Sequence, residues 1–195
     1  VSFLKQKVAA FESNRDAPEI IGESEPMQKL FNTIEKLKDT DANILILGEN
    51  GTGKDVIANL LYHSSPRAEK PFVRIDLGTI PEQLFESELF GHIKGAFTDA
   101  KNEKQGRFEI ANGGTLFLDE IANLTLPMQA KLLTAIEKQE ITRLGATTPS
   151  SINVRMICAT NANIHEMVEE GEFRQDLLYR VNTIELNIPP LRERG

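Results

Sequence analysis

Residues 48–55 read G-E-N-G-T-G-K-D and are the part of this chain best suited to chemistry. Three glycines let backbone N–H groups curl around an anion where a side chain would block the approach. The Lys54 ammonium can reach the outer phosphates of a nucleotide, and a helix that begins there adds its positive dipole end. The apolar run 43–47 before this segment and the helical pattern 56–62 after it supply the strand–turn–helix context. We therefore expect a phosphate-binding loop that holds a nucleoside triphosphate.

The residue after the lysine departs from the general pattern, which places Ser or Thr there to help hold magnesium. In this chain it is Asp55. A carboxylate is a hard oxygen ligand that can hold Mg²⁺ directly or through water. A glycine turn that merely caps a helix is the alternative, and the agreement of turn, lysine, strand and helix argues against it.

Two acids, Asp119 and Glu120, follow the apolar run 115–118. Beside a phosphate-binding loop, such a pair is typical of a magnesium carboxylate and a catalytic base. Asp119 would bind the metal or its water shell, and Glu120 would polarise the attacking water. A strand that simply ends in exposed acids is the alternative, and the phosphate-binding loop makes it the weaker interpretation.

Polar residues Thr160 and Asn161 end a further apolar segment, 152–159. Side chains at the carboxyl edge of a parallel sheet line the usual binding crevice of such folds. Asn161 could therefore orient the water or contact the terminal phosphate. It could also do no more than cap the helix that follows.

Two arginines, Arg174 and Arg180, are candidates for a neighbouring subunit's site, where they would stabilise transition-state charge. Within one helix they would lie about 120° apart around the axis, so they cannot both point the same way. Salt-bridged surface arginines are the alternative, because Glu172 and Asp176 lie close in sequence. Residue chemistry alone favours that alternative.

Composition describes an ordinary globular chain of 195 residues that can bury a sizeable core. The net charge of −7 argues against a broad nucleic-acid-binding face. The single cysteine, Cys158, excludes an internal disulfide framework and predicts a reducing, cytoplasmic location. No stretch approaches the ~18 apolar residues of a membrane span, so no membrane partner is expected.

Apolar periodicity predicts strands that alternate with helices, which implies an α/β fold with an open parallel sheet and helices on both faces. The expected strands are 43–47, 72–76, 115–119, 152–159 and 183–188, and the expected helices are 1–13, 26–38, 56–62, 81–90, 127–139, 164–170 and 174–181. We expect a long polar loop over 91–106. Phe97 lies in that loop between small residues, and from the residues alone we expect it to be a tucked core aromatic.

Several motifs together resemble one family, the AAA+ P-loop ATPase domain of bacterial sigma-54-dependent transcription activators. The resemblance covers about Ile20 to Arg194. The loop motif and the two closing motifs are diagnostic of that family. The matching segments are Ile21–Ser24, Glu88–His92, Gly95–Ala100, Gly113–Glu120, Phe173–Leu177 and Pro189–Arg194.

The resemblance implies an ATPase that works as a ring oligomer, usually a hexamer, with ATP and Mg²⁺ at subunit interfaces. Asp55 and Asp119 would hold the metal, while Thr160 and Asn161 match the first sensor, and Arg174 and Arg180 match the arginine fingers. The residues expected to hold the nucleotide are Ile21, Gly22, Gly48, Glu49, Asn50, Gly51, Thr52, Gly53, Lys54, Asp55 and Val56. The loop expected to contact sigma-54 comprises Gly95, Ala96, Phe97, Thr98, Asp99 and Ala100. Hydrolysis would drive that loop to remodel the closed promoter complex of RNA polymerase.

Two residues depart from the family pattern. The contact loop most often reads G-A-F-T-G-A, whereas Asp99 occupies its fifth position here. The family's switch position, often asparagine, aligns with Asp76, which would stand near the catalytic carboxylate. Two carboxylates repel unless one is protonated or a cation lies between them. We hypothesise that Asp76 still gates Glu120, through water or a shifted pKa.

The expected organisation is a linker helix over 1–18 and the α/β part of the ATPase domain over 19–195, without the helical lid. Regulatory and DNA-binding domains are expected elsewhere in the parent protein, so that DNA would be contacted only through a downstream domain. Without the lid we expect weak nucleotide affinity and poor self-assembly. The nearest alternative function is an AAA+ remodeller of another client, which the Phe97–Thr98 loop disfavours. A GTPase is disfavoured because no guanine-reading motif occurs, and the intact catalytic set argues against a module that binds nucleotide without hydrolysing it.

Overall fold

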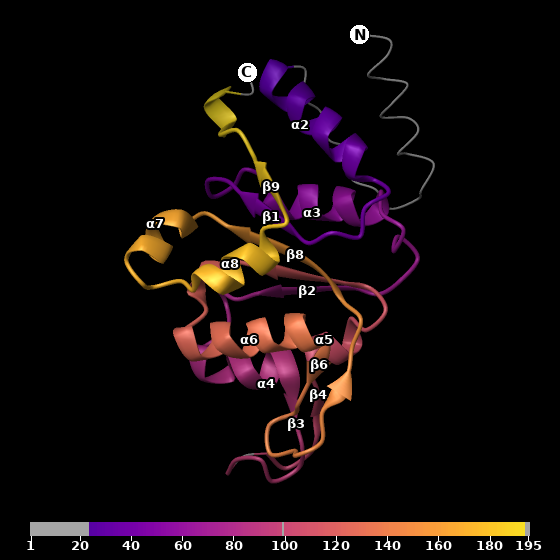
Figure 1. Ribbon diagram of the computed structural model, residues 1–195, viewed down its shortest axis with the longest axis vertical. Coiled ribbons are helices and arrows are strands. Elements are labelled where there is room, and N and C mark those ends of the chain that lie inside the picture. The colour runs from indigo at the N-terminus through magenta and orange to yellow at the C-terminus, as the bar shows by residue number, and fades with distance from the viewer. Residues whose placement is uncertain (1–23, 99, 194–195) are drawn as a thin grey trace.

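The computed structural model describes residues 24–98 and 100–193. Within them five parallel strands form one sheet in the order β2-β5-β8-β1-β9. The strands are β1 (Ile44–Leu47), β2 (Phe72–Asp76), β5 (Thr115–Asp119), β8 (Arg155–Thr160) and β9 (Ile184–Asn187). The expected parallel α/β sheet is confirmed, and its helices lie above and below it in Figure 1. None of the described helices is long and apolar enough to cross a membrane.

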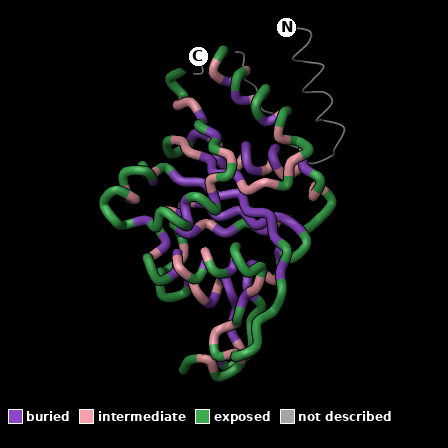
Figure 2. Tube along the Cα trace, viewed as in Figure 1, coloured by how far each residue is buried: buried purple, intermediate pink, exposed green. Residues whose placement is uncertain are grey.

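Side chains that alternate along the strands pack into two separate hydrophobic cores, one on each face of the sheet. Helices α2 (Glu25–Leu37) and α3 (Lys54–His63) cover one face, where Ile44, Phe117 and Ile157 are buried. Helices α4 (Phe85–Phe90), α5 (Arg107–Ile110) and α6 (Leu126–Lys138) cover the other. The strands run through the buried middle of the molecule in Figure 2.

Two further helices complete the side of the sheet at which the strands end. Helix α7 (Ile164–Glu169) follows β8, and α8 (Gln175–Val181) packs against α6 and β8. Single-turn 3-10 helices span Glu82–Leu84, Ile121–Asn123 and Leu191–Glu193. The helix predicted over 1–13, the linker over 1–18 and its boundary lie outside the described residues and stay predictions.

The sequence prediction was wrong for the segment 91–106, which is not a continuous loop. Strands β3 (Gly91–His92) and β4 (Lys104–Gln105) pair antiparallel and form a hairpin around residues 93–103. Both ends of this hairpin require glycine. A Cβ on Gly91 would lie 2.4 Å from the Lys104 carbonyl oxygen, and one on Gly106 would lie 2.3 Å from the carbonyl carbon of Phe90.

Two other predictions need correction. The strand expected over 152–159 spans Arg155–Thr160. Ile152 instead continues from β7 (Ser150–Ser151), which pairs with β6 (Glu140–Ile141), and donates its N–H to the Gln139 carbonyl. The helix expected over 81–90 is divided into a 3-10 turn over Glu82–Leu84 and helix α4. Short paired segments of two residues carry no periodic signal that a sequence could reveal.

Arg67 joins three segments at the end of the sheet opposite the strand carboxyl termini. Its Nε and Nη2 donate to both carboxylate oxygens of Asp41, at 2.6 and 2.5 Å. Its Nη1 donates to the carbonyl oxygens of Gly114 and Asn153, at 2.9 and 3.0 Å. Charge-assisted bonds of this kind are the stronger ones. One side chain thus anchors the entries to β1, β5 and β8.

We expect Arg67→Ala to lower the free energy of unfolding by about 2 to 3 kcal/mol, because two carbonyls and a carboxylate lose their donor. Chemical denaturation followed by circular dichroism measures the change. Arg107→Ala is the matched control, since its guanidinium makes a 3.6 Å ion pair with Glu88 at a more exposed position. Equal stability losses in the two variants would contradict this role for Arg67.

Candidate nucleotide site

The glycine-rich loop follows β1 directly and runs into α3, as the sequence predicted. Gly51 and Gly53 have φ values of +75° and +81°, which only glycine adopts without strain. Lys54 begins α3 and is buried, and its Nζ donates to the carbonyl oxygens of Gly48 and Glu49 at 3.2 and 3.4 Å. The loop therefore wraps around its own lysine, in the geometry of a phosphate-binding site at a helix N-terminus.

The carboxylate of Glu120 lies beside the ammonium group of Lys54. Its Oε1 is 3.5 Å from the Nζ of Lys54. Its Oε2 accepts from the Thr160 hydroxyl at 3.4 Å and from the Asn161 backbone N–H at 3.3 Å. The backbone of Glu120 has φ +56° and ψ +49°, a left-handed conformation that is uncommon for residues other than glycine. The structure thus brings the predicted base together with the lysine and the predicted sensor.

Asn161 connects the sensor segment to the glycine-rich loop, since its Nδ2 donates to Oδ1 of Asn50 at 2.7 Å. The alternative that Asn161 only caps the next helix is wrong. Asn163 caps α7, and its side chain accepts from the Glu166 backbone N–H. Val56 lies in α3 and Thr52 lies in the glycine-rich loop, as expected. The Thr52 hydroxyl donates to the Glu49 carbonyl oxygen at 2.7 Å.

Asp55 and Asp119, the two predicted metal ligands, are held together by one side chain. Arg74 donates from Nη2 to Oδ2 of Asp119 at 3.1 Å and from Nη1 to Oδ2 of Asp55 at 3.3 Å. Burial raises the pKa of the Asp119 carboxyl, while the Arg74 guanidinium acts to lower it. Negative charge on the nearby Asp76 and Glu120 also acts to raise the pKa of Asp119.

These two carboxylates fit a magnesium ion bound through few protein ligands. Oδ1 of Asp119 is buried and has no hydrogen-bond partner among the described residues, so it offers a coordination site or a bond to a metal-bound water. Within the described ranges no group of three or more His, Cys, Asp or Glu is placed to hold a metal ion by itself. That arrangement suits Mg²⁺, which keeps several waters and takes its other ligands from phosphates.

Asp76 ends β2 beside Asp119, with which it is in register. Its Oδ1 accepts from the Gly78 backbone N–H at 2.8 Å. A Cβ on Gly78 would lie 3.1 Å from that oxygen and 3.7 Å from Cγ of Glu120, so both acids flank the same glycine. The structure therefore places Asp76 next to Asp119 and Glu120, with its carboxylate bonded to the turn that leads to α4.

The two arginines do not join this site within one subunit. Arg174 precedes α8 and is not inside it, so the 120° argument does not apply. Its guanidinium pairs with Asp176 at 2.6 Å. Arg180, in the last turn of α8, pairs with Glu137 of α6 at 3.0 Å. The ion pair with Asp176 that the sequence raised as an alternative is present, and both guanidinium groups remain about half exposed.

The loop 93–103 lies at the far end of the molecule, at the bottom of Figure 1. Phe97 is 42% exposed, so the expectation of a tucked core aromatic is wrong. Its ring packs edge-on against His92, 5.0 Å between centroids. His92 itself contacts the Ser87 hydroxyl at 2.8 Å and the Asn102 carbonyl oxygen at 3.1 Å. Bonds from Gly95 N–H to the Ala100 carbonyl and from Ala100 N–H to the Phe97 carbonyl shape the tip.

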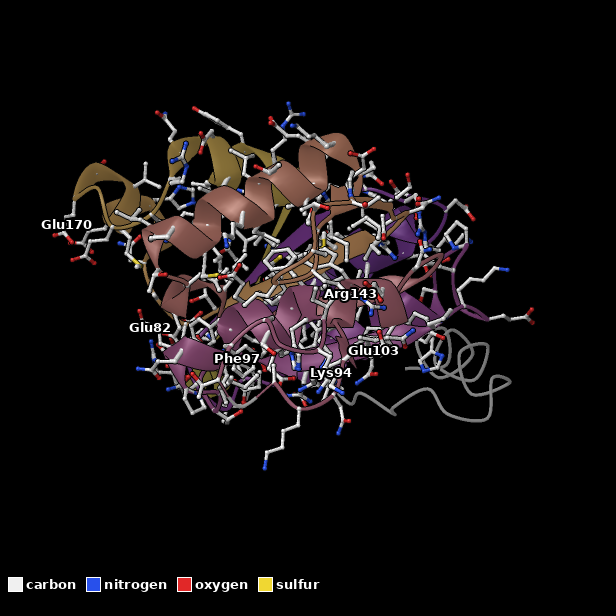
Figure 3. All side chains as sticks on the ribbon, turned by 90° about the horizontal axis from the view of Figure 1, so that it is seen from below. Glu82, Lys94, Phe97, Glu103, Arg143 and Glu170 are labelled. Atoms are coloured by element: carbon white, nitrogen blue, oxygen red, sulfur yellow. The ribbon has the colours of Figure 1, made fainter. Side chains whose placement is uncertain are left out.

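A second loop, residues 142–149, packs against this hairpin. The Ile93 N–H donates to the Leu144 carbonyl at 3.1 Å, and the Leu144 N–H donates to the Gly91 carbonyl at 2.9 Å. Arg143 pairs with Glu109 at 2.6 Å and with Glu103 at 3.3 Å. Figure 3 looks onto this end and labels Phe97, Lys94, Glu103 and Arg143. Ile21, Gly22 and Asp99, from the predicted sets, lie outside the described residues.

Sequence reasoning missed two charged residues of the site. Arg74 is the one charged residue inside the apolar run 72–75, and its position two residues before Asp76 places both on one face of the strand. Arg192 donates to both Glu49 carboxylate oxygens at 2.9 Å, which ties the segment after β9 to the glycine-rich loop. A charge within an apolar strand was the available signal for Arg74, whereas nothing local indicated the partner of Arg192.

Comparison with known proteins gives a consistent result. The sigma-54 interaction domain family matches residues 20–187. The transcriptional activator HyfR of Escherichia coli K12 is 50% identical over 182 residues, which are 93% of this chain and 27% of HyfR. The response regulator PilR of Pseudomonas aeruginosa is 50% identical over 175 residues, 90% of this chain and 39% of PilR. The chain thus spans well under half the length of these relatives.

Solved structures agree with the sequence relatives. NtrX from Brucella abortus in complex with ATP superposes with a TM-score of 0.84 at 35% identity, over 99% of this chain and 40% of that one. The P-loop NTPase domain of a sigma-54 transport activator from E. coli superposes with a TM-score of 0.58 at 22% identity, over 88% of this chain and 99% of that one. At that identity the similarity supports the fold alone. Given the glycine-rich loop, the paired acids and a family match over residues 20–187, this chain belongs to the sigma-54 interaction domain family, and its fold is that of the P-loop NTPases.

Proposed function

We propose that this chain is the ATP-hydrolysing motor of a sigma-54-dependent transcription activator that remodels the closed promoter complex of RNA polymerase. The observation that carries this proposal is the position of Glu120, bonded at once to the phosphate-loop lysine and to the Thr160–Asn161 segment. Family membership supports ATP as the nucleotide. Work on RNA polymerase would place the protein in the cytoplasm.

The residues divide the reaction between them. The loop of residues 48–53 and Lys54 bind and orient the phosphates, and the positive end of α3 favours their charge. Asp55 and Asp119 would hold Mg²⁺, which would supply positive charge to the phosphates. Glu120 orients and polarises the water that attacks the terminal phosphate. Asn161, whose side chain is hydrogen-bonded to Asn50 of the loop, would report whether that phosphate is present.

The active form we propose is a ring, hexameric as in the family, with the nucleotide at the subunit interface. Arg174 and Arg180 are exposed on the α8 side and do not reach the site in cis, which fits a role in the neighbouring subunit. To act there each guanidinium must exchange its present carboxylate, Asp176 or Glu137, for phosphate oxygens. Because both pairs are exposed, that exchange costs little.

The client contact we propose is the tip of the 93–103 hairpin, with Phe97 as its apolar anchor. One continuous segment leads to it from the catalytic edge. It begins at Asp76, turns at Gly78, passes through α4 and enters β3. A shift of Asp76 relative to Glu120 would therefore be transmitted to the loop. Contact with DNA would need another part of the protein.

Glu120→Gln tests the hydrolytic role. The amide cannot accept a proton from water, so we expect the ATPase rate of the full-length protein to fall by about 100-fold or more. Nucleotide binding should persist, whereas Lys54→Ala should abolish it. Both are measured by phosphate release and by fluorescent nucleotide titration at rising protein concentration, where a rate per subunit that climbs indicates assembly. Wild-type hydrolysis by the Glu120→Gln protein would remove Glu120 from the mechanism.

Asp76→Asn tests the gating hypothesis. The amide oxygen can still accept from Gly78, while the amide nitrogen can donate to a neighbouring carboxylate and hold it inactive. We expect the basal ATPase rate to fall by about threefold to tenfold, with a larger relative stimulation by sigma-54. Asp76→Ala, which loses the turn bond as well, is the control. An unchanged rate and an unchanged response in the asparagine variant would sink the hypothesis.

Phe97→Ala tests the client. We expect the wild-type protein to co-elute with sigma-54 when hydrolysis is trapped by an ADP–metal fluoride, and the alanine variant to lose that binding. Its ATPase rate should stay within about twofold of wild type, because Phe97 lies far from the phosphate loop. Phe97→Leu, which retains apolar bulk, should bind partly. A protein that hydrolyses ATP but never captures sigma-54 would favour another client, the second function we considered.

A further inference from the structure

Arg74 lies on the edge strand β2, on the face that α3 covers. In register it stands beside Phe117 of β5, and its guanidinium carbon lies 5.5 Å from the centroid of the Phe117 ring. That ring is buried and lies beneath the guanidinium group. The side chain is thereby directed along the sheet toward the ends of the strands, where Asp119 and the start of α3 lie.

The guanidinium divides its two terminal nitrogens between two carboxylates of different elements. Nη2 donates to Asp119 at 3.1 Å and Nη1 donates to Asp55 at 3.3 Å, both to the Oδ2 atoms. Asp119 is buried, while Arg74 and Asp55 are each about 44% exposed. Arg74 thus links the two predicted metal ligands, through a buried contact with Asp119 and a solvent-exposed contact with Asp55.

The same two carboxylates are the ones that fit magnesium. Both Oδ2 atoms are hydrogen-bonded to Arg74, while Oδ1 of Asp119 has no partner in the part of the chain that the structure describes. A divalent cation that bound these groups would meet a positive charge within reach of the same oxygens. It would therefore have to displace at least one of the two guanidinium bonds or tolerate the repulsion.

We propose that Arg74 is a positioning residue whose guanidinium competes with Mg²⁺ for the carboxylates of Asp55 and Asp119, and so sets the metal concentration at which the site fills. The inference rests on the proposed ATPase site. Before the metal binds, Arg74 keeps the two carboxylates together against their mutual repulsion. When the metal binds, the Asp55 end is the one that opens, because it is longer and more exposed than the Asp119 end.

The test measures metal binding directly and does not depend on turnover. Mn²⁺ is the probe, and free Mn²⁺ is followed by electron paramagnetic resonance in saturating ADP, with Mg²⁺ as competitor. We expect Arg74→Gln to bind Mn²⁺ about threefold to tenfold more tightly than wild type, because one nearby positive charge and two partly exposed ion pairs are removed. Arg74→Lys keeps the positive charge but loses the two-armed guanidinium group, so its Mn²⁺ affinity should lie between those of the wild type and Arg74→Gln.

Lys131→Gln is the matched control. It removes one positive charge from an ion pair, with Glu86, on the opposite face of the sheet, and should leave Mn²⁺ affinity unchanged. Thermal melting of all four proteins shows whether each is folded. If Arg74→Gln is unfolded, the Mn²⁺ affinity of Arg74→Lys decides the test. Equal or weaker Mn²⁺ binding by folded Arg74 variants overturns the inference while the proposed ATPase site stands. A wild-type protein that binds no Mn²⁺ with ADP overturns both.

Discussion

The site depends on one constraint, the parallel alignment of four strands whose carboxyl ends meet at the same edge of the sheet. β1 leads into the glycine-rich loop, β5 into the paired acids and β8 into the predicted sensor pair, and β2 ends at Asp76. Backbone register sets their spacing, since Asp76 is beside Asp119 and Leu47 is beside Thr160. Asp76, Asp119 and Thr160 are the last residues of their strands, and Glu120 and Asn161 follow directly, so little freedom remains in where these side chains begin. Rigid elements of this kind hold a catalytic set more precisely than loops do.

Charge is the second organising element of this edge. Four acids, Asp55, Asp76, Asp119 and Glu120, surround two basic groups, Lys54 and Arg74. Arg74 bonds two acids that would otherwise repel each other, and Lys54 pairs with Glu120. The excess of negative charge attracts a divalent metal, and the positive charges favour the phosphates that accompany it. Glu120 combines an uncommon left-handed backbone with a carboxylate that pairs with Lys54, as residues at functional sites often do.

The sequence was sufficient for the sheet and for most of the residues that the structure brings together at the candidate site, because both rest on local signals. The strands 72–76 and 115–119 were predicted to the residue, since each is a short apolar run bounded by polar residues. The motifs of the candidate site were visible because their residues lie at or directly after the ends of strands. What failed depended on partners distant in sequence, as with the two-residue strands of the hairpin, the exposure of Phe97 and the pairing of Arg192 with Glu49. No local pattern records a contact between residues 143 positions apart.

The bonds between the hairpin and the loop 142–149 have a mechanical consequence. Main-chain hydrogen bonds join Leu144 to both Gly91 and Ile93, and Arg143 clamps Glu109 behind them. If a partner contacts Phe97, as we propose, it would meet two joined loops and not a single flexible tip. One loop connects to the sheet through α4 and the other through α6. A movement at the strand ends would then reach both loops together, and a difference between the two connections would tilt the pair.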